Sequence, residues 1–342
     1  MVRNIWGRGV YVSIFGIACV ALTGCGSGDS QLTSTPVQSG ASSNWLGNEL
    51  GTRVLDASGA RLRWPKQNST GPSWVLPEAK TEDLLYISNV YTVTVYSYPK
   101  GKHVGTLKGF YRPLGECSDE AGDVFIADGG DSILEYAHGG KKPIQTLTLS
   151  GYGAQSCAVD PTTGNLAVTW DDNFTKGYVA VYKNASGNPT LYTNGDMLFS
   201  FCGYDPAGNL YVDGTSSKGN EFLFAELPEG SGTMQTITLD QSFQHWGAVQ
   251  WDGKYVAVTD NEVNTMYRFT ISGSSGTLEG TVDLGGAQPL YQLVIDGKKV
   301  VGADDLSNAA WYWDYPAGGS PVKSITEDVF HPFGATISKA TK

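Results

Sequence analysis

The sequence lacks the short signatures by which common hydrolases and nucleotide-dependent enzymes are recognised. It contains no Gly-x-Ser-x-Gly elbow, no His-Glu-x-x-His motif and no phosphate-binding P-loop. Histidine, the residue best suited to general acid–base catalysis at neutral pH, occurs only four times in 342 residues. These absences favour a binding role over catalysis.

Basic residues are also scarce. The chain has 23 Lys and Arg against 34 Asp and Glu, a formal net charge of −11 at pH 7. An acidic protein repels phosphate backbones and anionic lipid headgroups. We therefore expect no nucleic-acid partner and no docking on anionic membranes through a basic patch.

Cysteine is rare, and part of it lies near the N-terminus. Cys19 and Cys25 fall in the first 25 residues, which leaves Cys117, Cys157 and Cys202 for a folded domain. An odd number in an exported protein suggests buried free thiols more than a disulfide framework. The spacing of Cys157 and Cys202 matches the repeat described below, so small buried strand positions explain them well.

Residues 1–24 have the pattern of an export signal. Arg3 and Arg8 precede an apolar run over 10–22 that is short for a membrane span. The tetrapeptide Leu22-Thr23-Gly24-Cys25 resembles the lipobox of bacterial lipoproteins. The resemblance implies cleavage before Cys25 and acylation of Cys25, with palmitate among its lipids, which would hold the protein on the outer membrane, in the periplasm or at the cell surface.

The remainder divides into a tether and a domain. Residues 25–73 contain Cys25 followed by a stretch rich in Ser, Gly and Thr, which predicts a flexible spacer. Residues 74–342 are assigned to one folded domain, which we expect to be monomeric.

A structural repeat begins at Leu84. Each copy has a short apolar strand, a loop, a second strand with Tyr or Phe, and a Gly turn, and equivalent positions are 40, 42, 44, 45 and 45 residues apart. Four short strands per 40–45 residues are typical of a β-propeller blade. Six copies predict an all-β fold, a six-bladed β-propeller of four-stranded blades, with first strands centred on Leu85, Phe125, Ala167, Tyr211, Val256 and Val301.

The end of the chain predicts how the ring closes. An inner-strand element precedes most copies, and His331–Ser338 matches that element although no further strands follow it. We expect this C-terminal strand to become the inner strand of the first blade. Trp74–Leu76 is the alternative candidate.

Residues 122–136 resemble an NHL repeat, a unit of six-bladed propellers that serve mainly as binding platforms. This resemblance implies a protein, glycan or small-molecule ligand. The senescence-marker/gluconolactonase propellers are similar and imply an alternative, a metal-dependent lactonase, hydrolase or lyase with calcium as cofactor. Asp260 resembles one ligand of that metal site, whereas Trp74–Ala79 and His245–Ala248 depart from its other motifs.

Two sets of candidate site residues follow from the predicted ring. Residues just before inner strands should line one mouth, where cationic, hydrogen-bonding and aromatic groups could hold a ligand. Carboxylates on an inner strand or in the loops after first strands could hold a divalent metal, although such loops are commonly only solvated. The ligand candidates are Arg112, Tyr152, His245, Trp246 and His331; the metal candidates are Glu116, Asp128, Asp260 and Asp304; His103 and His138 are expected to be solvated turn residues.

Overall fold

The computed structural model describes residues 71–149, 153–171, 175–219 and 221–341. The predicted signal, the lipidation site Cys25, the tether up to residue 70 and the ligand candidate Tyr152 lie outside the described residues. Within the described residues, no helix has the length and apolar character needed to cross a membrane.

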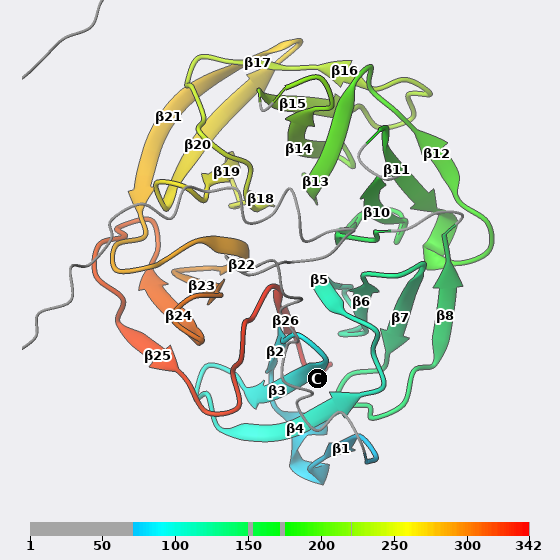
Figure 1. Ribbon diagram of the computed structural model, residues 1–342, viewed down its shortest axis with the longest axis vertical. Helices are drawn as coiled ribbons and strands as arrows, with labels where there is room; N and C mark the ends of the chain where they lie inside the picture. Colours follow the sequence, from blue (N-terminus) through cyan, green and yellow to red (C-terminus); the bar gives the residue numbers. More distant parts are fainter. Residues whose placement is uncertain (1–70, 150–152, 172–174, 220, 342) are drawn as a thin grey trace, which may run out of the picture. The chain divides into compact units, whose positions relative to one another are not determined.

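Six small sheets surround a central axis, with β5, β13, β18, β22 and β26 closest to the middle (Figure 1). Pairing within each sheet is antiparallel apart from one two-residue parallel strand. The helical elements of the described residues are two short 3-10 turns, η1 (Pro77–Thr81) and η2 (Lys183–Ala185). The predicted all-β, six-bladed propeller is confirmed.

The second to fourth blades follow the predicted order from the axis outward. The middle strands are buried on both faces because each blade is covered by its two neighbours, which explains runs such as Val-Phe-Ile-Ala. The strands are β5 (Pro113–Ser118), β6 (Val124–Asp128), β7 (Ser132–Tyr136) and β8 (Gln145–Thr148); β9 (Ser156–Val159), β10 (Leu166–Asp171), β11 (Gly177–Tyr182) and β12 (Thr190–Tyr192); β13 (Met197–Tyr204), β14 (Leu210–Ser216), β15 (Phe222–Leu227) and β16 (Gln235–Thr236).

The fifth and sixth blades repeat this pattern with one addition. The connection out of the fourth blade adds a two-residue strand, β17 (Thr238–Leu239), in parallel to the outer edge of the fifth blade. The other strands are β18 (Val249–Trp251), β19 (Val256–Asp260), β20 (Thr265–Ser272) and β21 (Ser275–Asp283), then β22 (Leu290–Asp296), β23 (Lys299–Asp304), β24 (Ala309–Asp314) and β25 (Lys323–Ile325).

The first blade joins the two ends of the described chain. Its inner strand is β26 (Ala335–Ser338), which pairs with β2 (Leu84–Ser88), followed outward by β3 (Thr92–Ser97) and β4 (His103–Lys108). The prediction of closure by the C-terminal strand is confirmed. The alternative candidate lies at the opposite edge, where β1 (Trp74–Val75) pairs with β4 as a fifth strand. The first and fifth blades therefore have five strands, one more than predicted, because a short flanking segment covers each outer edge.

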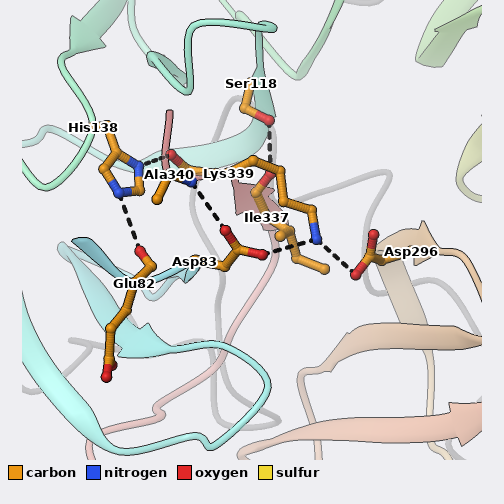
Figure 2. Close-up of polar contacts among 9 residues, drawn as sticks. Glu82, Asp83, Ser118, His138, Asp296, Ile337, Lys339 and Ala340 are labelled. Atoms are coloured by element: carbon orange, nitrogen blue, oxygen red, sulfur yellow. Dashed lines mark hydrogen bonds and ion pairs between the residues drawn. The ribbon is translucent and has the colours of Figure 1, made fainter. Parts of the chain in front are cut away.

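Polar contacts fasten the closing strand (Figure 2). Lys339 Nζ lies 2.8 Å from Asp296 Oδ2 and 3.3 Å from Asp83 Oδ2. The ring of His138 contacts Ser338 Oγ at 2.6 Å and the carbonyl oxygen of Glu82 at 3.1 Å. The prediction that His138 is a solvated turn residue is wrong, because the ring links the second blade to both segments of the first.

His103 is likewise not a free turn residue. It begins β4, its Nδ1 lies 2.9 Å from Asp328 Oδ2, and its Nε2 contacts Gly105 O at 2.9 Å. Its ring also packs on Trp74 with centroids 5.0 Å apart. The expected solvated position is therefore wrong here too.

A disulfide joins the inner strands of the second and third blades. Cys117 on β5 is bonded to Cys157 on β9, with their Cα atoms 5.6 Å apart, whereas Cys202 on β13 is free and buried. The prediction of free thiols is thus correct for Cys202 and wrong for the other two. Neighbouring inner strands approach closely at the axis, which brings cysteines of adjacent blades within bonding distance.

Candidate functional site

Three of the carboxylates predicted to bind a metal, Asp128, Asp260 and Asp304, have the same structural role in three different blades. Asp128, Asp260 and Asp304 end the second strand of their blades, and each accepts backbone N–H groups from the segment that leads into the inner strand. Asp128 accepts from Tyr111 and Arg112 at 2.8 and 2.5 Å. The corresponding donors are Gln244 and His245 for Asp260, at 2.6 and 3.2 Å, and Gln288 for Asp304, at 2.8 Å.

The four metal candidates do not form one group. Among the described residues, three or more His, Cys, Asp or Glu ligand atoms come within 4.8 Å of one another at one place, His103 with Glu327 and Asp328 on the outer part of the first blade. Asp128, Asp260 and Asp304 already accept two or more donors each. These residues do not fit a shared calcium ion of the gluconolactonase type.

Addition of calcium is therefore expected to leave the melting temperature of the purified chain unchanged, as is excess chelator. A metal that binds the native state raises the melting temperature by mass action. Differential scanning calorimetry with millimolar calcium, then with EDTA, tests this. A rise with calcium that Asp260→Asn removes would contradict it.

The predicted ligand candidates separate into two places. His331 Nδ1 lies 2.7 Å from Asp305 Oδ1, and the charge of Arg112 also acts on this carboxyl, whose pKa is nevertheless raised by burial. His245 lies elsewhere, with its ring 4.7 Å from that of Trp246, and burial lowers its pKa. The structure thus brings Arg112 and His331 together around an acid, and places His245 beside an aromatic ring, where burial disfavours its charged form.

The axis is blocked by apolar side chains at the mouth where these candidates lie. Five blades each contribute one large apolar residue from the inner strand or from the segment just before it, and the rings of Tyr291 and Phe333 stack at 4.8 Å. We call this group the apolar plug; all its members are buried, and they are Leu114, Phe201, Trp246, Tyr291 and Phe333. Trp246, predicted as a ligand contact, is part of it.

A cavity of about 290 Å³ lies on the axis beyond the plug, toward the other end of the inner strands. We call it the axial pocket. Its size is near the lower limit for small-molecule sites in proteins. Every inner strand contributes lining residues, among them Glu116, Cys157, Gly203, Gln250, Val294 and Ala335.

Glu116 is the ionisable acid of this pocket. Its Oε1 accepts a hydrogen bond from Ser88 Oγ at 2.6 Å, while Oε2 is buried and has no partner among the described residues. Its backbone N–H and carbonyl are held by the side-chain amide of Gln292, both at 2.8 Å. Burial, only partly offset by the bond from Ser88, raises the pKa of Glu116 to about 8.

Substitution Glu116→Gln is expected to flatten the pH dependence of stability. The carboxyl titrates near 4.5 in the unfolded chain and near 8 in the fold, so the native state keeps a proton that the unfolded state loses. Stability is therefore lost as pH rises from about 5 to 8, by at most about 1.4 kcal/mol per pH unit. Urea denaturation at pH 5, 6, 7 and 8 measures this. A constant difference between variant and parent at all four values would contradict it.

The sequence pattern did not identify two other buried polar residues near the axis. Asp213 on β14 accepts N–H groups from Phe201 and Gly247, both at 2.8 Å, and burial raises its pKa well above the usual value. Gln292 on β22 bonds to the backbone of Glu116 and Ala335, which belong to two other blades. A polar residue within a buried apolar strand was the available signal in both cases.

Comparison with known proteins shows the fold alone. The chain matches no family model and no curated protein. It resembles a chain of a nidogen/laminin complex (13% identity, TM-score 0.62, 76% of this chain and 100% of that one). It also resembles a protein of unknown function from Bacteroides caccae (11%, 0.56, 75% and 99%) and the β-propeller domain of Cps50 (Swd1) from Myceliophteria thermophila (11%, 0.51, 77% and 91%).

Proposed function

We propose that this chain is an exported, lipid-tethered propeller that binds a small ligand in the axial pocket. The observation that carries the proposal is the pocket itself, which is lined by every inner strand and includes Glu116, a residue with one unpartnered buried oxygen. A concave site with few, defined polar groups is the usual form of a small-molecule site. Its volume of about 290 Å³ favours a small molecule over a protein or glycan surface.

A binding role agrees better with the arrangement of acids than the metal-dependent lactonase, hydrolase or lyase alternative. Hydrolysis assisted by calcium needs several oxygen ligands at one point. Asp128, Asp260 and Asp304 instead fix the segments that lead into three inner strands. Glu116 would remain as a single carboxylate on the axis.

Two features support export. The Leu-Thr-Gly-Cys sequence ending at Cys25 gives a site for acylation. The Cys117–Cys157 bond is of a kind that persists in oxidising compartments and is rare in the bacterial cytosol. Cells fed radiolabelled palmitate test this proposal: the parent chain should carry label and sediment with membranes, and Cys25→Ser should do neither. An unlabelled parent would overturn the tether.

The binding proposal is tested by thermal-shift screening of the purified chain against small metabolites of all charge types. Gln250→Trp places a large ring in the pocket, and Lys298→Trp adds the same ring at an exposed position that does not line it. Ligands that stabilise the parent and Lys298→Trp should fail with Gln250→Trp. Hits that survive Gln250→Trp would place the binding site elsewhere.

A further inference from the structure

The unsatisfied oxygen of Glu116 distinguishes this acid from other buried carboxylates of the propeller, such as Asp128, Asp260 and Asp205. Asp128 and Asp260 each receive two backbone donors, and Asp205 receives N–H groups from Ala207 and Asn209, both at 2.9 Å. Glu116 receives one donor, from Ser88, and its Oε2 has none. A buried carboxylate can accept several hydrogen bonds and is costly when it lacks them, so a donor is missing at this point.

The rest of the lining favours a positively charged donor. The residues that line the axial pocket include one carboxylic acid and no Lys, Arg or His. Two half-buried aromatic residues, Tyr204 and Trp251, belong to the same wall. Aromatic faces attract ammonium groups, and the effect is larger where water is excluded.

A second cavity beside the axial pocket is also lined by acidic residues. This cavity, of about 310 Å³, shares Ser118, Val159 and Pro161 with the axial pocket. Three of its lining residues are acidic, Asp119, Glu120 and Asp160, and none is basic. We call it the acidic groove. A cation that approaches the axial pocket along the acidic groove is attracted by these three carboxylates. The formal net charge of the protein, −11, adds to this attraction.

We propose that the ligand of the axial pocket is a small organic amine in its ammonium form, which donates an N–H hydrogen bond to the Glu116 carboxylate and lies against the rings of Tyr204 and Trp251. This inference depends on the proposed function and specifies its ligand class. Glu116 releases its proton to solvent as the ammonium group arrives, so that carboxylate and ammonium form an ion pair with the bond from Ser88 retained.

Binding should consequently depend on pH through Glu116. Burial places its pKa at about 8 in the free protein, so the carboxyl is mainly protonated at pH 6, and ion pairing must displace that proton. The groups that face it are Ser88 and Tyr86 from β2, Gln292 from β22 and Gly334 just before β26. Of these only the Tyr86 phenol titrates, and burial raises its pKa above the usual value, so it stays neutral in this range.

The test uses isothermal titration of the full chain with four probes of one carbon skeleton: butylamine, butyltrimethylammonium, butanol and butyrate. We expect butylamine to bind, its affinity to rise about tenfold per unit from pH 6 toward 8 and then level off, and protons to be released. Butyltrimethylammonium, which has no N–H, should bind at least tenfold more weakly. A fifth probe, 1,4-diaminobutane, should bind more tightly than butylamine, because the acidic groove offers carboxylates to a second ammonium group.

Matched variants separate the possible failures. Glu116→Gln keeps the shape and the bond from Ser88 but should lose butylamine binding at least tenfold and abolish its pH dependence. Glu221→Gln, at an exposed acid that lines neither cavity, should leave butylamine binding unaffected. Butanol or butyrate binding that Gln250→Trp removes and Glu116→Gln tolerates would overturn the amine and leave the pocket as the binding site. Butylamine binding that persists in Gln250→Trp would overturn both proposals, and absence of butylamine binding would overturn the amine alone.

Discussion

Deletion of residues 331–342 is expected to abolish cooperative folding, with a loss of more than about 5 kcal/mol, the lower end of stability for a domain of ordinary size. The deletion removes β26, whose Ala335–Ser338 pairs with four residues of β2 at the axis. Without it, Leu85 and Ile87 lose the partners with which they form one core cluster, Ala335 and Ile337. The first blade would then present an unpaired inner strand to solvent.

The ring makes this loss larger than that of an ordinary edge strand. Gly334, just before β26, lies so close to the second blade that an added Cβ would fall 2.2 Å from the carbonyl oxygen of Leu114. Ser118 Oγ donates to the carbonyl of Ile337 at 2.8 Å (Figure 2). Removal of β26 therefore opens the contact between the first and second blades as well.

Urea denaturation followed by circular dichroism measures the effect. Deletion of 341–342 is the matched control, because Thr341 is exposed. Lys339→Ala removes the ion pairs of a half-exposed side chain and its contact with the ring of Tyr98, and should cost no more than about 1 kcal/mol. A cooperative transition near the parental midpoint after deletion of 331–342 would show that the ring does not need its closing strand.

Replacement of both Cys117 and Cys157 by Ala is expected to lower the free energy of unfolding by about 2–4 kcal/mol, since the bond closes a loop between residues 40 apart. The crosslink restricts the unfolded chain, and this effect grows with the number of residues in the loop that it closes. It also holds together two strands that line the axial pocket. Loss of the bond should therefore weaken ligand binding together with stability.

Denaturation of the parent with and without a reductant, beside the double variant, tests this prediction. Peptide mapping of unreduced protein should recover Cys117 and Cys157 in one linked fragment. Cys202→Ala, which alters a free buried thiol, should not respond to the reductant differently from the parent. An unchanged midpoint on reduction would contradict the structural role of the bond.

Much of the fold was predictable because blade formation is local. The second strand of each blade is a short apolar run, such as Leu84–Ser88 or Val256–Asp260. Turn residues on either side locate the two ends of that strand to within a few positions. The match of His331–Ser338 to an inner strand likewise needed only comparison with the other copies. The extra strands β1 and β17 were missed because two residues carry no periodicity.

The site was less predictable. The sequence placed Glu116 on an inner strand and Arg112 and His331 at one mouth, and the structure agrees with these positions. It could not show that the apolar plug fills this mouth, because the plug combines single residues from five blades. It also could not show which acids were already satisfied, since capping of a loop and binding of a metal use the same residue type.

The sequence by itself determined the four strands of each blade, their order, the number of blades and the strand that closes the ring, because these depend on patterns within 40–45 residues. The tertiary structure alone decided which cysteines pair, which end of the axis is open and which carboxylate lacks a partner. Glu116 is hydrogen-bonded to Ser88, which lies 28 residues away in the sequence, and to Gln292, which lies 176 residues away. These residues become neighbours only when the whole ring closes, so no local pattern in the sequence predicts that they are in contact.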